Sequence, residues 1–200
     1  MSHSPAPGQG SPLHIPASSY LALPWKTGQG ITEEICLLPE GATRDRFDLR
    51  ISCAPIPEVA TFSAFPGVER VITLIEGAGL DLDFGDRLLR LELLAPCRFD
   101  SGLAPVGRPD GDGVRVINVM AARDRWRITT ARVMSAAFQS DVPAGGLAVL
   151  FAIAGEWEAA GCRIGSRDTL ILPAGAATAC HPVTKEGNAA ALEVVLVPRD

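Results

Sequence analysis

Short apolar segments separated by glycine and proline recur along the whole chain of 200 residues. Several alternate in polarity: Leu80, Leu82 and Phe84 share one face, while Asp81 and Asp83 share the other. This period of two is typical of a strand with one buried and one solvated face. No segment carries a helical apolar stripe over three turns, so the pattern predicts an all-β sandwich or barrel. The predicted strands are 49–54, 71–76, 80–84, 88–94, 114–120, 127–134, 148–154, 169–173 and 190–197.

An internal repeat divides these strands into two sets. The segments from Val71 and from Val149 both read as an apolar strand that ends in glycine, at Gly77 and Gly155. A short strand, a turn, another strand and a proline follow in each copy. The glycines would permit tight turns, and each proline would end a strand. A repeat of this length predicts two similar β-barrel halves.

The first 16 residues differ from the rest of the chain, because they hold four prolines, two glycines and no apolar run. This composition predicts a disordered leader at 1–16 and not a signal peptide, which indicates a cytoplasmic protein. The two barrels are then expected at 17–125 and 126–200. The longest apolar run, Leu147 to Ala154, has eight residues, whereas a membrane-spanning helix needs roughly 18 or more. No membrane partner is therefore expected.

Charge and cysteine content narrow the classes of function further. The chain has 18 lysines and arginines against 23 acidic residues, for a net charge of −5. A nucleic-acid-binding protein normally shows a basic face, so no nucleic-acid partner is expected. The cysteines form no C-x-x-C pair, which argues against a disulfide framework and a zinc cluster. Those expected to be reduced and mostly buried are Cys36, Cys53, Cys97, Cys162 and Cys180.

One predicted strand carries polar residues on the face opposite its apolar ones. Leu49 and Ile51 face one way, so Arg50 and Ser52 share the other face, which could be the barrel interior. An inward arginine needs an anionic partner. Three alternatives stay open: a structural carboxylate such as Glu76, the carboxylate of a ligand, or a solvated outer face.

The segment from Leu23 to Ile35 combines a stiff entry with a glycine-rich turn. Pro24 restrains the backbone, Trp25 supplies an apolar anchor, and the glycines free the backbone to bring Lys26 close to a ligand. The alternative is an ordinary turn with a solvated lysine. The glycine spacing fits no nucleotide-binding pattern, so no nucleotide site is predicted.

Six spaced blocks of residues occur in order between Tyr20 and Trp126. They are Pro24-Trp25-Lys26-x-Gly28-x-Gly30, Arg50-Ile51-Ser52, Phe62-Ser63-x-Phe65-Pro66-Gly67-x-x-Arg70, Leu74-Ile75-Glu76-Gly77-x-Gly79, Phe99-Asp100-x-Gly102 and Asn118-Val119-Met120. Together they resemble the HutD/Ves family of cupin-like proteins. The resemblance implies two cupin-like jelly-roll β-barrel halves, a bicupin. It also implies a part in bacterial histidine utilisation through binding of an intermediate such as urocanate or formylglutamate, without an established catalytic reaction.

The chain departs from the family pattern at three positions. Thr27 and Gln29 stand where the family usually has asparagine and glycine, and Val116 stands where an aspartate is common. These departures could change the ligand. Many cupins hold a metal through histidines, but His181 is the only histidine outside the leader, and no His-x-His follows the repeat glycines. We therefore expect no metal and no other cofactor.

These observations predict that the protein binds a small carboxylate metabolite and regulates histidine utilisation. The ligand carboxylate is expected against Arg50, with help from Arg70 and Lys26. Asn118 could hydrogen-bond the ligand or satisfy a buried backbone group. The predicted ligand-binding residues are Trp25, Lys26, Thr27, Arg50, Ser52, Phe62, Arg70, Glu76 and Asn118.

Two other classes of function stay open. The first is a metal-independent enzyme, an isomerase or hydrolase, that uses Lys26 and Glu76 as acid and base; Glu33 and Cys53 are further reactive groups. The second is a scaffold for protein interactions with an unused pocket. Pairing of sheet edges would also allow a homodimer.

Overall fold

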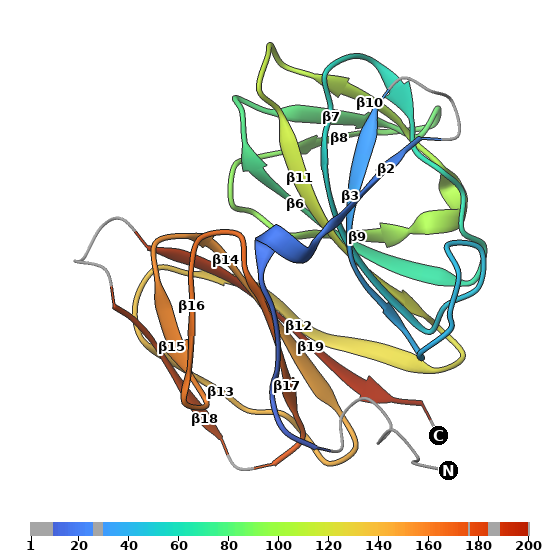
Figure 1. Ribbon diagram of the computed structural model, residues 1–200. Helices are drawn as coiled ribbons and strands as arrows, with labels where there is room; N and C mark the ends of the chain where they lie inside the picture. Colours follow the sequence, from blue (N-terminus) through green and yellow to red (C-terminus); the bar gives the residue numbers. More distant parts are fainter. Residues whose placement is uncertain (1–9, 26–29, 176, 184–188, 200) are drawn as a thin grey trace. The chain divides into compact units, whose positions relative to one another are not determined.

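The computed structural model describes residues 10–25, 30–175, 177–183 and 189–199, and these form two compact units (Figure 1). The first unit runs from Leu21 to Arg125, and the second contains residues from Trp126 onward together with the described N-terminal residues up to Tyr20. Strands dominate both units, and the described residues contain short 3-10 turns but no α-helix. Accordingly, no helix of the described chain is long and apolar enough to cross a membrane.

The first unit, here called the first barrel, consists of two antiparallel sheets. The six-stranded sheet has the order β2 (Leu21–Pro24), β3 (Ile31–Leu38), β4 (Leu49–Pro55), β11 (Arg115–Ala122), β6 (Val68–Glu76) and β9 (Cys97–Asp100). The four-stranded sheet has the order β5 (Ala60–Thr61), β10 (Val106–Pro109), β7 (Leu80–Asp83) and β8 (Leu88–Leu91). Strands that neighbour in space are often distant in sequence, as expected of a jelly roll.

The second unit, here called the second barrel, has the same two-sheet design. Its five-stranded sheet has the order β1 (Leu13–Ile15), β17 (Thr169–Pro173), β14 (Leu147–Ala154), β19 (Ala190–Pro198) and β12 (Trp126–Met134). Its four-stranded sheet has the order β13 (Phe138–Ser140), β18 (Thr178–Pro182), β15 (Trp157–Ala159) and β16 (Cys162–Ile164). The prediction of an all-β bicupin is therefore confirmed.

The N-terminal segment belongs to the sheet of the second barrel. β1 pairs antiparallel with β17, with Leu13 opposite Ile171, and the blue segment runs beside β17 in Figure 1. The residues that follow, up to Tyr20, are part of the same unit. This corrects the expectation of a disordered leader at residues 13–15, and also the placement of residues 17–20 in the first barrel. Pairing with a strand about 150 residues later leaves no local signal in the sequence.

The internal repeat corresponds to equivalent elements in the two barrels. The long strands β6 and β14 are each followed by a hairpin, β7–β8 in one barrel and β15–β16 in the other. Gly77 and Gly155 take φ of 103° and 73° after these strands, a conformation that glycine adopts without steric cost. Pro173 ends β17, whereas Pro96 precedes β9. The expectation that each proline ends a strand is therefore wrong for Pro96.

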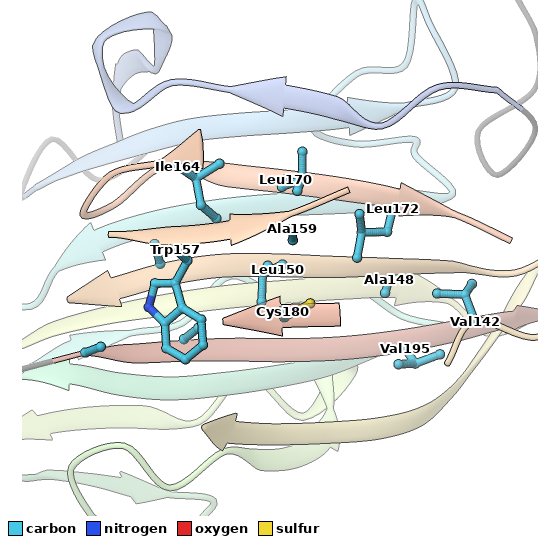
Figure 2. Packing of buried hydrophobic residues seen from close by; sticks show 13 residues of the cluster. Val142, Ala148, Leu150, Trp157, Ala159, Ile164, Leu170, Leu172, Cys180 and Val195 are labelled. Carbon is cyan, nitrogen blue, oxygen red and sulfur yellow. The ribbon is translucent and has the colours of Figure 1, made fainter. Parts of the chain in front are cut away.

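Apolar side chains fill the space between the two sheets of the second barrel (Figure 2). Trp157 is fully buried there, and its ring meets Phe138 edge-to-face with centroids 5.9 Å apart. The cluster combines small residues such as Ala148 and Ala159 with larger ones such as Leu150, a mixture that allows close packing. The interior of this barrel is a packed core.

The described residues of the first barrel include two separate hydrophobic clusters. The larger cluster gathers around Ile72, Leu74 and Val116. The smaller one is centred on Phe47, Val68 and Met120. Members of both clusters line a cavity in the same barrel.

Candidate functional site

A cavity of about 930 Å³ lies in the first barrel. Its wall is formed by residues of β4, β5, β6 and β11 and by the loop segments 44–47, 62–67 and 123–124. The volume falls in the range of small-molecule sites in proteins, which is roughly 300–1,000 Å³. The cavity can therefore hold a metabolite.

Strand alternation and register bring two arginines to this wall. Arg50 and Ser52 face the cavity from β4, as the sequence predicts. Met120 of the central strand β11 pairs with Arg50 on one side and with Arg70 of β6 on the other. The three residues form one row across the sheet, and the ring of Phe65 lies 5.6 Å from the Arg50 guanidinium carbon and 5.8 Å from that of Arg70.

Arg50 is held by a buried carboxylate. Its Nε donates to Oε1 of Glu34 at 2.9 Å, and its Nη2 donates to Oε2 at 2.9 Å. The two residues are 7% and 6% exposed, so this is a buried bidentate pair of the kind that fixes a guanidinium in one orientation. Of the alternatives for Arg50, a structural ion pair is thus present, with Glu34 as the partner and not Glu76.

Arg70 has no carboxylate partner among the described residues. Its Nε and Nη2 donate to the Ser101 hydroxyl at 3.1 and 2.8 Å, and Nη2 also donates to the Ser63 carbonyl at 3.2 Å. Phenylalanine rings surround the guanidinium, and Arg70 is only 4% exposed. Burial, and then the neighbouring Arg50, lower the pKa of Arg70 to about 9. A buried cation that lines a cavity without a counter-charge is suited to pair with an anion.

Asn118 adds a second unsatisfied polar group to the wall. It lies on β11 opposite Ser52, is 5% exposed, and lines the cavity. Its Oδ1 has no hydrogen-bond partner within the described residues. Buried side-chain oxygens usually have a partner, so this atom has an unused acceptor position.

Aromatic residues form the apolar part of the wall. The Trp25 indole Nε1 donates to the Thr32 hydroxyl at 2.9 Å. The indole ring also covers Gly30, because a Cβ added to Gly30 would lie 2.8 Å from the ring. The Phe62 ring lies against Gly107 in the same way, because a Cβ added to Gly107 would lie 2.6 Å from Cε2 of Phe62. The two glycines let the rings approach the backbone closely.

Charged residues of two loops complete the wall, and sequence reasoning missed them. Arg44, Arg46 and Arg123 line the cavity together with Asp45 and Asp124. They lie in loops without periodicity, so no sequence pattern marked them. With Arg50 and Arg70, the wall holds more arginines than carboxylates although the whole chain is acidic. Such a surface favours anionic ligands.

Glu34, Phe65 and Ser101 were also missed as functional residues. Phe65 stands in one of the six sequence blocks, and Glu34 follows the glycine-rich turn, so both had a signal. Their roles depend on contacts with Arg50 and Arg70, which only the fold reveals.

Not all predicted site residues come to the cavity. Trp25, Arg50, Ser52, Phe62, Arg70 and Asn118 line it. Glu76 does not: its carboxylate accepts from Arg115 Nε at 3.2 Å, and Arg115 also pairs with Glu33 at 3.1 Å. The placement of Glu76 in the site is therefore corrected. Lys26 and Thr27 lie outside the described residues.

The described histidines belong to the second barrel. His14 lies 3.0 Å from a carboxylate oxygen of Asp168, and His181 lies 3.7 Å from one of Glu158. Within the described ranges, no three histidine, cysteine or acidic side chains come close enough to hold a metal ion.

Each unit contains two sheets, and the first barrel contains the cavity. These features define the class of protein as a cupin-like double barrel with a pocket of small-molecule size. The chain belongs to the HutD family, whose model matches residues 17–191.

Known relatives agree with this assignment. The chain is 38% identical to Protein Ves of Citrobacter koseri over 136 residues, 67% of this chain and 69% of that protein. It is 36% identical over 112 residues to an uncharacterized 21.2 kDa protein in the hutC 3′ region of Pseudomonas putida. This match covers 56% of this chain and 58% of that protein. It is also similar to the solved structure of HutD from Pseudomonas fluorescens SBW25, with a TM-score of 0.77 and 27% identity over 95% of this chain and 100% of that one.

Proposed function

We propose that this protein binds a small carboxylate metabolite in the cavity of the first barrel and thereby regulates histidine utilisation. Arg70 is the observation that carries the proposal. It is a buried guanidinium on a cavity wall, and no carboxylate among the described residues neutralises it. A ligand carboxylate would supply the missing charge and accept hydrogen bonds from Nη1, which has no described partner.

The neighbouring residues support the same ligand chemistry. Arg50 uses Nε and Nη2 to pair with Glu34, and its Nη1 has no partner among the described residues. Both arginines of the row can therefore contact one carboxylate. Ser52 and Asn118 offer hydrogen bonds one step further along the strands. Trp25 and Phe62 provide apolar surface for the remainder of the ligand.

The link to histidine utilisation rests on relatives. The chain belongs to the HutD family, and the similar protein of P. putida is described by its place in the hutC 3′ region. Urocanate and formylglutamate are carboxylates of that pathway, and both are small enough for the cavity. A cytoplasmic location is part of this proposal, because all five cysteines are free thiols.

Calorimetric titration of the chelator-treated protein with urocanate, formylglutamate, histidine and glutamate tests the proposal. Formate belongs in the panel, because the HutD structure from P. fluorescens is described as a formate condition. We expect saturable one-site binding of one acid, with the ligand recovered unchanged. No binding by any member would contradict the assignment to this pathway.

Analysis of the recovered ligand also tests the alternative of an enzyme. A new product would replace our proposal of binding alone by that of turnover. The geometry does not favour an acid–base pair of Lys26 and Glu76, because Glu76 lies away from the cavity in a pair with Arg115.

A further inference from the structure

We infer that Ser101 is a positioning residue of the carboxylate site, which holds the Arg70 guanidinium so that its Nη1 stays available to the ligand. This inference rests on the proposed function and adds a residue to its machinery. Ser101 does not touch the ligand itself, because it is fully buried and does not line the cavity. It acts through Arg70, which does line the cavity.

Ser101 occupies for Arg70 the place that Glu34 occupies for Arg50. In each arginine, Nε and Nη2 donate to a single side chain. The Arg50 bonds to the Glu34 carboxylate are 2.9 Å each, and the Arg70 bonds to the Ser101 hydroxyl are 3.1 and 2.8 Å. A hydroxyl oxygen has two lone pairs and can accept both N–H groups. A guanidinium held along this edge keeps one orientation, and Nη1 is the nitrogen that remains for a ligand.

The two partners differ in charge. Glu34 cancels the charge of Arg50, whereas the neutral Ser101 hydroxyl orients Arg70 and leaves its charge uncancelled. Arg70 is only 4% exposed, and three phenylalanine rings lie 5.3 to 5.8 Å from its guanidinium carbon. Water therefore screens this charge weakly. A ligand carboxylate would meet a donor that is both oriented and charged, which is the strong form of hydrogen bond.

The backbone around Ser101 is fixed independently of its hydroxyl. Ser101 begins the 3-10 turn η2 (Ser101–Leu103), which Asp100 caps with its side chain. Asp100 also pairs with Arg123 of the cavity wall at 2.9 Å. The Ser101 carbonyl accepts from the backbone N–H of Phe65, another residue of the wall, at 3.0 Å. Removal of the hydroxyl therefore leaves these bonds in place and takes away only the acceptor of Arg70.

Ser101→Ala tests the effect on binding by calorimetry. Urocanate, formylglutamate, histidine, glutamate and formate are each titrated into the wild-type protein and the variant. For an acid that binds the wild type, we expect the variant to bind at least about tenfold more weakly. Ser140→Ala is the matched control, because Ser140 is a buried serine of the second barrel that does not line the cavity. It should bind the same acid within about twofold of the wild type.

The Nε–H signal of Arg70 in a nitrogen–proton correlation spectrum reports the position of the guanidinium without any ligand. This signal is identified by its absence from the spectrum of Arg70→Met. In Ser101→Ala we expect it to shift, or to broaden through faster exchange with water, because its acceptor is gone. In Ser140→Ala it should stay where it is in the wild type. A purely structural role of Ser101 elsewhere in the barrel would leave the signal unchanged.

The two measurements together separate the inference from the proposal beneath it. Unchanged acid binding in Ser101→Ala would overturn the inference and leave the carboxylate proposal intact, even if the Arg70 signal moves. Weaker binding with an unchanged Arg70 signal would also overturn it, because the loss would then arise elsewhere than at Arg70. Absence of binding by all five compounds to the wild-type protein would refute the carboxylate proposal, and the inference with it.

Discussion

Arg50 and Arg70 share one cavity wall but differ in what holds them. Glu34 neutralises Arg50 through a bidentate pair. The described partners of Arg70 are all neutral, because its hydrogen bonds go to Ser101 and Ser63 and its other contacts are phenylalanine rings. Removing one member of a buried ion pair destabilises the fold, and a buried charge without a counter-ion costs free energy. We therefore expect Arg70 to lower the stability of the protein, which is the pattern expected of a ligand-binding group.

Replacing Arg70 with methionine separates binding from stability. Methionine keeps the apolar length of the side chain among the phenylalanine rings and removes the unpaired charge. We expect Arg70→Met to lose carboxylate binding by at least about a hundredfold, with a free energy of unfolding within about 1 kcal/mol of wild type or higher. Calorimetry and urea unfolding measure the two quantities. A marked loss of stability would show that Arg70 serves the fold.

Arg50 should behave in the opposite way. Arg50→Ala leaves Glu34 buried without a partner, so we expect a loss of about 3–5 kcal/mol in the free energy of unfolding. The double variant Arg50→Met with Glu34→Leu removes both charges and should recover most of that loss. Urea unfolding of the two variants makes the comparison. If the double variant is no more stable than Arg50→Ala, the unpaired carboxylate is not the cause.

At the scale of the element, the position of Trp25 depends on the start of β3. Gly30 lies under the indole ring, and its carbonyl oxygen accepts a hydrogen bond from the backbone N–H of Trp25 at 2.8 Å. A Cβ at position 30 would meet the ring at 2.8 Å, so Gly30→Ala must push the indole away from its place on the cavity wall. We expect a loss of about 1–3 kcal/mol and weaker ligand binding, measured by urea unfolding and calorimetry.

Gly175 offers a matched control for this substitution. A Cβ there meets no atom within 4 Å, and its φ is not in the left-handed region. We expect Gly175→Ala to leave stability and binding nearly unchanged. Equal effects of the two substitutions would mean that the contact between Gly30 and Trp25 is unimportant.

The sequence predicted most of the long strands, although not β3, and it missed most of the short ones. All nine predicted strands are present within a few residues, because their apolar periodicity is strong. Strands of two to four residues, such as β5 and β10, carry too few positions for a period to show. In β3, a register shift between Glu34 and Cys36 interrupts the alternation, and this bulge is where Glu34 meets Arg50.

The candidate site was predictable where it lies on strands and not where it depends on contacts across the barrel. Alternation placed Arg50 and Ser52 on the cavity wall correctly. Glu76 was only an example of a structural carboxylate that could pair with Arg50, because nothing local distinguishes it from Glu34. Only the pairing of β3 with β4 brings Glu34 to Arg50.

At the scale of the whole molecule, the N-terminal segment links the start of the chain to the second barrel. β1 extends the sheet at β17, and the segment is anchored next to it by Asp168. The carboxylate of Asp168 accepts from the backbone N–H of Ala17 at 2.8 Å and of Gly165 at 3.0 Å, and His14 lies 3.0 Å away. One side chain thus joins the N-terminal segment to the loop before β17.

This arrangement predicts a dependence of stability on pH. Burial alone would raise the pKa of Asp168, but the hydrogen bonds from Ala17 and Gly165, with the adjacent His14, hold it below its ordinary value of 3.8. A carboxyl group whose pKa is lower in the folded state stabilises the fold fully above its ordinary pKa. This stabilisation is lost as the pH falls through the ordinary range toward the lowered value.

Asp168→Asn tests the charge of this anchor while keeping its shape. In a Trp25→Phe background, the fluorescence of Trp126 and Trp157 follows urea unfolding of the second barrel alone. At pH 7 we expect Asp168→Asn to be about 2 kcal/mol less stable than its parent, and the difference should shrink between pH 5 and 3 (roughly the ordinary carboxyl range). Asp141→Asn, at an exposed aspartate, should change little at either pH. A difference that stays constant with pH would mean that Asp168 anchors the N-terminal segment through its shape and not through its charge.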